Sequence, residues 1–174
     1  MTTITVSYIL KSSTYQTIGA LKGILSKGEA HARKLNLDDS ILLGHRLFPD
    51  MFDLTRQVQI ACDTAARGAA RLAGLDMPSF PDTEQGFSEL MDRCTRAVAY
   101  VHSVEDDKID ATTNTVLQIP MGANTMPMEG RAYLQGFILP NMTFHTTMAY
   151  ALLRMQGVSL GKRDYLVPPS AGQE

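Results

Sequence analysis

The fold is decided near the end of the chain, where residues 137–157 read FILPNMTFHTTMAYALLRMQG. One set of side chains recurs at intervals of three and four, so it shares one face of a helix: Ile138, Asn141, His145, Met148, Leu152 and Met155. Polar residues interrupt the stretch too often for a membrane helix, which needs about 20 mostly apolar residues. The pattern predicts a core helix and no membrane contact.

Three further helices are expected before it. The first covers about Thr5–Leu35, and the second runs from an N-cap at Asp50 to a stop at Gly74. Asp82 and Gln85 resemble a capping box for the third helix, which ends near residue 103. Each helix carries an apolar stripe, and four long amphipathic helices predict an all-α four-helix bundle.

The segment between the third and fourth helices loses the helical period. Residues 115–119 have the composition of a strand, residues 122–124 resemble a turn, and residues 125–128 can return as a second strand. A small β-hairpin packed on the bundle is therefore expected. The last helix begins near residue 129, and Pro140 either kinks it or starts a new segment.

Composition is that of a globular chain. Its 174 residues include 44% hydrophobic and 20% charged residues, and the formal net charge is −2. We expect one domain over residues 1–166 and a loose tail over residues 167–174. The charge balance argues against nucleic acid as a partner. No secretory signal precedes the first helix, so a cytoplasmic location is expected.

The two cysteines, Cys62 and Cys94, lack paired spacing, so they indicate neither a disulfide framework nor a zinc site. Both lie on or beside apolar stripes. We expect them to be inert thiols of the core.

The apolar face of the last helix contains Asn141 and His145, one turn apart. A buried polar group without a partner costs about 1–3 kcal/mol, so the two require an explanation. One interpretation is a ligand pocket or a metal ligand set inside the bundle. The other is a core histidine that is hydrogen-bonded to a neighbouring helix.

If consecutive helices alternate in direction, all four histidines lie at one end of the bundle: His31, His45, His102 and His145. His102 and Gln57 then flank the apolar stripes of their helices and are candidate ligand-binding residues. Arg131 and Tyr133, at the start of the last helix, are candidates for binding a carboxylate and a polar group, or else form a surface pair.

Several motifs resemble an uncharacterised bacterial and fungal family, a domain of unknown function, within the DinB/YfiT-like superfamily of metalloenzymes. They are Leu139–His145 followed by Ala149–Arg154 and Gly157, Pro49–Met51 with Gln57 and Arg71–Gly74, and Leu160–Lys162 with Asp164 and Tyr165. The resemblance implies a four-helix bundle of unusual connectivity, often a homodimer. It also implies a central metal on three histidines, used by thiol-dependent transferases and isomerases.

The sequence departs from that metal pattern. His145 matches the second histidine of the last-helix pair, Asn141 occupies the first position, and the second helix has no histidine. Zinc or nickel normally needs at least three nitrogen, sulfur or carboxylate ligands. We therefore expect no cofactor and a lost or degenerate metal site, with His145 as the ligand if a metal is bound.

These features leave three functional hypotheses, and they do not decide whether the chain is an enzyme. The first is a pocket that binds or transforms a small organic molecule, with His145 as catalytic acid or base, or as hydrogen-bond anchor. In it, Asn141 and Gln57 orient the ligand and Arg131 meets an anionic group. The alternatives are a zinc- or nickel-dependent thiol transferase or isomerase, and a non-catalytic dimerising bundle.

Overall fold

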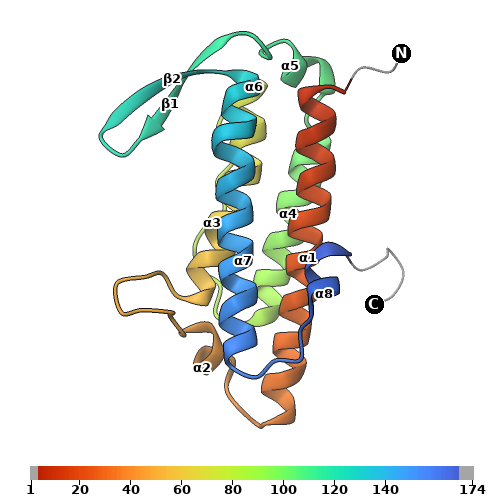
Figure 1. Cartoon of the computed structure of the whole chain (residues 1–174), viewed down its shortest axis with the longest axis vertical. Helices are drawn as coiled ribbons and strands as arrows, with labels where there is room; N and C mark the ends of the chain where they lie inside the picture. Colours follow the sequence, from red (N-terminus) through yellow and green to blue (C-terminus); the bar gives the residue numbers. More distant parts are fainter. Residues whose placement is uncertain (1–3, 169–174) are drawn as a thin grey trace.

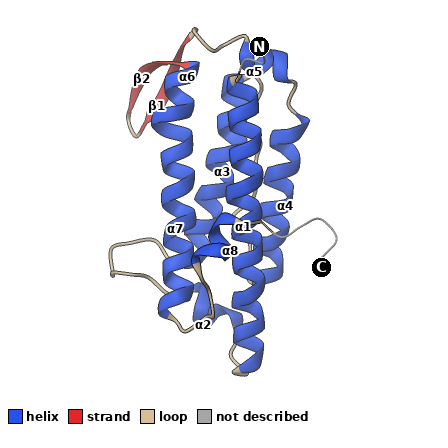
Figure 2. Ribbon diagram, turned by 45° about the vertical axis from the view of Figure 1, so that its right-hand side comes forward, coloured by secondary structure: helices blue, strands red, loops and turns tan. Residues whose placement is uncertain are grey.

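The structure, a computed structural model, describes residues 4–168. Within that range four long helices lie side by side (Figure 1): α1 (Val6–Lys34), α3 (Leu54–Leu72), α4 (Phe87–Ser103) and α7 (Leu139–Met155). A hairpin of β1 (Val116–Met121) and β2 (Asn124–Glu129) projects from one end of the bundle, as Figure 2 also shows. The predicted all-α bundle with a hairpin between its third and fourth long helices is confirmed.

Shorter helical segments join these elements. They are α2 (Asp39–Leu43), α5 (Asp106–Asp110), α6 (Gly130–Tyr133), the π-helical turn η1 (Leu134–Ile138) and α8 (Lys162–Leu166). Among the described residues, no helix is both long and apolar enough to cross a membrane. Most of the predicted tail, residues 169–174, lies outside the described range.

The long helices do not alternate in direction. Near the start of α1, Lys11 donates to the backbone oxygen of Val104, just after α4 ends, at 2.7 Å. At the other end of the bundle, the N–H of Phe87 at the start of α4 donates to Asp39, just after α1, at 3.1 Å. The start of α3 and the end of α7 lie at this same α2 end. Therefore α1 and α7 run one way, and α3 and α4 run the other way.

The alternation assumed in order to place the histidines at one end does not hold, and the connection between α3 and α4 gives the reason. Residues 73–86 return from the hairpin end to the α2 end before α4 begins. At about 3.3 Å per extended residue, this link is long enough to span the roughly 28 Å length of α3.

Buried Arg93 of α4 anchors that return link. Its side chain is fully enclosed and lies 2.6 Å from Asp63 of α3, 3.0 Å from Asp82 and 2.8 Å from Glu84. Burial alone would raise the pKa of Glu84, but hydrogen bonds from Arg93 and Gln59 outweigh it and lower that pKa. Ion pairs to Arg93 thus hold the segment of residues 73–86 against the bundle.

Two predicted helix starts are wrong for local reasons. Asp53, not Asp50, is the N-cap of α3, and its carboxylate accepts the N–H of Arg56 at 2.8 Å. The predicted capping box before α4 does not form, because the carboxylate of Asp82 is engaged by Arg93 and Arg56 instead.

Helix α3 is buried on most of its surface, and small residues make this possible. Its enclosed small side chains are Ala61, Cys62, Ala65, Ala66, Gly68, Ala69 and Ala70. A Cβ added at Gly68 would lie 2.7 Å from the Ile138 side chain, so the absence of a side chain there lets η1 approach α3. Close packing against its neighbours follows from these residues.

The last helix is continuous from α6 to α7 and contains a π turn just before Pro140, since Tyr133, Ile138 and Leu139 all keep right-handed helical torsion angles. The π turn η1 ends at Ile138, and α7 begins at Leu139 with Pro140 in its first turn. Proline has no N–H and its ring clashes with the carbonyl four residues earlier, so a widened turn before it relieves both problems. The helix runs on through Pro140, so the prediction that Pro140 starts a new segment is wrong.

A glycine at the start of α6 has no room for a side chain. A Cβ at Gly130 would clash with the backbone oxygen of Thr112, whereas one at Gly136 would meet only the flexible end of Met128 at 3.4 Å. Gly130→Ala should therefore lower the free energy of unfolding by about 1–3 kcal/mol, and the matched control Gly136→Ala by much less. Urea unfolding measures both; equal losses would contradict this account.

Candidate functional site

The central polar contact of the bundle joins α7 to α3. His145 Nδ1 lies 2.7 Å from Gln57 Oε1, and both side chains are buried, with exposed fractions of 8% and 1%. Gln57 Nε2 donates in turn to the backbone oxygen of Phe52 at 3.1 Å. The structure thus brings together two of the residues predicted for the site.

This chain of contacts fixes the protonation of the imidazole. The Phe52 carbonyl can only accept, so the NH₂ group of Gln57 must face it and the amide oxygen must face His145. Nδ1 then carries the hydrogen, and Nε2 of the neutral ring keeps a lone pair. Nε2 has no hydrogen-bond partner among the described residues, and it is not one of the fully enclosed unpaired atoms. It is therefore an unpaired acceptor that is not fully enclosed.

The surroundings of His145 favour the neutral ring. Burial lowers the pKa of His145 below its ordinary value of 6.5, and the positive charge of Arg56 lowers that pKa further. The adjoining Phe144 ring contacts the imidazole edge-to-face at 5.2 Å between centroids, and this phenyl side chain is 52% exposed. His145 is thus a neutral base beside an exposed aromatic ring.

Asn141, one turn before His145, is also tied to α3. Its Nδ2 donates to Thr64 Oγ1 at 2.8 Å, while its side-chain oxygen has no hydrogen-bond partner among the described residues. Sequence reasoning missed Thr64. Its position two turns after Gln57 on α3 was the available signal, since residues seven apart share a helix face.

The other predicted ligand-binding residues lie elsewhere. Arg131 is exposed and pairs with Glu129 at 2.8 Å, and buried Tyr133 accepts from Arg71 at 3.1 Å. At about 1.5 Å per helical residue, Tyr133 is roughly 18 Å from His145 along the helix. His102 is exposed at the hairpin end, 6.4 Å from the Tyr15 ring, so the four histidines do not share one end.

His145 lines neither of two hollows on the surface of the described residues. One, of about 370 Å³, lies over the start of α4 and is bordered by Glu84, Glu89 and Asp92. The other, of about 210 Å³, lies at the α2 end and is bordered by His31 and His45. The polar pair of α3 and α7 is therefore separate from both hollows.

A three-ligand metal centre does not fit the donor set at His145. Zinc or nickel needs at least three nitrogen, sulfur or carboxylate ligands. The free donors here are one imidazole nitrogen and the amide oxygen of Asn141, and the Arg56 charge opposes a cation. Within residues 4–168, no three His, Cys, Asp or Glu side chains are grouped to hold a metal ion.

Comparison with known proteins gives the family. A family model described as a domain of unknown function, DUF1993, matches residues 9–166. The chain belongs to the DUF1993 family. It is similar to the crystal structure of a DinB family member protein from Shewanella denitrificans, with 34% identity, a TM-score of 0.84, and coverage of 96% of this chain and 95% of that one. None of the curated proteins matches it.

The resemblance to an uncharacterised DinB-like family is thereby confirmed. The crystal structure shares the fold over almost its whole length. Family membership carries no activity with it, because the description of DUF1993 names none.

The buried contact of this DUF1993 protein can be measured as a coupling energy. In a double-mutant cycle of Gln57→Leu and His145→Leu, each single change leaves a buried polar group unpaired and should cost about 1–3 kcal/mol. The double variant should lose about 1 kcal/mol less unfolding free energy than the sum of the losses in the two single variants. Additive losses in urea unfolding would contradict the contact.

The lowered pKa of His145 predicts a pH dependence. His145 takes up a proton near pH 6.5 in the unfolded chain and only at lower pH in the folded protein. The contribution of neutral His145 to the free energy of unfolding is therefore complete above pH 6.5, and it is lost as the pH falls from there towards the folded-state pKa. Between pH 7 and pH 5, wild type should lose more unfolding free energy than His145→Gln. An equal loss in both would show that His145 is not responsible.

Proposed function

We propose that this protein binds a small organic molecule that donates a hydrogen bond to Nε2 of His145. The observation that carries the proposal is the Phe52–Gln57–His145 chain of hydrogen bonds, which leaves an unprotonated ring nitrogen without a partner among the described residues. Asn141 supplies a second unpaired acceptor one turn away. The ligand class supported is one with O–H or N–H donors.

An apolar part of the ligand is also supported. The exposed rings of Phe144 and Phe52 belong to residues that adjoin the pair, and each is 52% exposed. Aromatic faces bind planar or apolar groups, while two fixed acceptors orient the polar end. If the donor group of the ligand is acidic, the neutral imidazole takes its proton and acts as a general base.

The thiol transferase hypothesis receives less support, because the donor set at His145 falls short of three metal ligands. We propose that the superfamily metal site is lost in this chain. The metal content of protein purified without a histidine tag tests this directly. Less than about one tenth of an equivalent of zinc or nickel is the expected result, and near-stoichiometric metal would overturn it.

The ligand proposal is tested by a fragment screen read by protein-observed NMR. Fragments with O–H or N–H donors should shift resonances of α7 around His145, and His145→Gln should weaken their binding by tenfold or more, as expected for a lost hydrogen bond to a buried partner. His45→Gln is the matched control, since His45 is exposed at the α2 end. It should leave every shift in place.

If His145→Gln leaves all fragment shifts unchanged, the proposed site is wrong. The third hypothesis, a non-catalytic dimerising bundle with core polar residues, would then be preferred. Homodimerisation, a cytoplasmic location and a single domain over residues 1–166 stay predictions. One continuous core that includes residues of α1, α3, α4 and α7 supports the single domain.

A further inference from the structure

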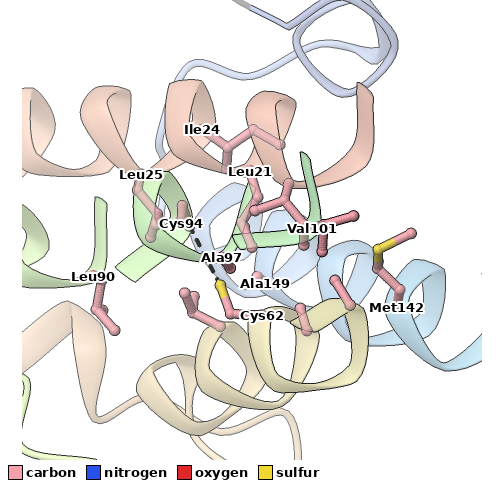
Figure 3. Packing of buried hydrophobic residues seen from close by; sticks show 14 of the residues in the cluster. Leu21, Ile24, Leu25, Cys62, Leu90, Cys94, Ala97, Val101, Met142 and Ala149 are labelled. Atoms are coloured by element: carbon pink, nitrogen blue, oxygen red, sulfur yellow. Dashed lines mark hydrogen bonds between the residues drawn. The ribbon is translucent and has the colours of Figure 1, made fainter. Parts of the chain in front are cut away.

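The two cysteines of the chain meet inside the bundle. Cys62 of α3 and Cys94 of α4 are both buried, and their sulfur atoms lie 3.8 Å apart (Figure 3). They are separated by 32 positions in the sequence, so only the packing of α3 against α4 brings them together. The bundle thus contains a pair of thiols in contact.

A bond between the two cysteines requires their sulfur atoms to come closer together. Figure 3 shows the pair where α3 and α4 meet, with Leu21 and Leu25 of α1 on one side and Ala97 of α4 nearby. A disulfide needs about 2.05 Å between sulfur atoms, so the two must approach by about 1.8 Å. Rotation of the two cysteine side chains, together with a slight shift of α3 against α4, has to supply this approach.

The closed fold keeps both thiols reduced. The hydrogen bond with Cys94, then burial, raises the pKa of Cys62 well above its ordinary value. A protonated thiol is a poor nucleophile, and no reagent reaches a side chain that is at most 1% exposed. Exchange with an external disulfide therefore begins only when the α3–α4 contact opens.

When α3 and α4 pack together again, the core determines which disulfide is the stable product. A mixed disulfide carries a bulky thiol that the close-packed core cannot hold, whereas a bond between Cys62 and Cys94 adds no atoms. The second exchange, in which the remaining cysteine attacks the mixed disulfide, is therefore favoured as the helices pack together again. The structure stabilises the intramolecular bond over the mixed one.

We propose that Cys62 and Cys94 form a redox modification site, which a low-molecular-weight disulfide such as oxidised glutathione converts into a disulfide between α3 and α4. One protein dithiol and one oxidised glutathione give one protein disulfide and two reduced glutathione molecules. Two electrons and two protons pass from the cysteines to the reagent. This site is independent of the ligand site proposed at His145.

The test equilibrates the full chain, without denaturant, in mixtures of oxidised and reduced glutathione. Remaining thiols are then alkylated in denaturant, and intact mass and peptide maps are recorded. In the oxidising mixtures we expect a mass loss of two hydrogen atoms, no alkylation, and a peptide that links Cys62 to Cys94. The far-UV circular dichroism should be unchanged. Tm should rise by roughly 5–15 °C, because the crosslink between the two helices restricts the conformations of the unfolded chain.

Cys62→Ala and Cys94→Ala are the matched controls. Each keeps one thiol and a small apolar side chain at the other position, so each should fold and show no rise in Tm in oxidising mixtures. The proposal is overturned if wild type stays fully alkylatable or accumulates mixed disulfides. It is also overturned if the bond forms only with loss of helical signal or with a Tm at or below that of the reduced chain.

Discussion

The close packing of α3 is the constraint on which the rest of the structure depends. This helix can approach its neighbours closely because most of its buried positions carry alanine, cysteine or glycine. A polar side chain buried between closely packed helices is most stable when it pairs with another group of the protein. Gln57, Thr64 and Cys62 all lie on α3, and each has its partner on an adjacent helix.

The chemistry of the candidate site follows from that constraint. The carbonyl of Phe52 orients the Gln57 amide, and the amide orients the His145 ring. The ring is left with one unprotonated nitrogen that has no partner among the described residues. No charged partner is involved, so the imidazole stays neutral rather than becoming half of an ion pair. Nδ1 is thus used in the buried hydrogen bond to Gln57, and Nε2 remains as an unpaired acceptor.

Local sequence patterns predicted much of this. The spacing of three and four on the last helix identified Asn141 and His145 as polar groups on an apolar face, and partners on a neighbouring helix were one of the two interpretations. Asp50 was a wrong N-cap because Asp53 offers the same chemistry one turn later. The direction of α4, the Arg93 cluster, Thr64 and the Cys62–Cys94 contact depend on how distant segments pack, which no local pattern encodes.

The protonation of one imidazole tests the central claim most directly. In ¹⁵N-labelled protein at pH 7, long-range proton–nitrogen correlations report separately on the two ring nitrogens of His145. The account predicts a neutral ring with the hydrogen on Nδ1 and a nitrogen shift typical of an unprotonated Nε2. A hydrogen on Nε2, or a doubly protonated ring at that pH, would contradict it.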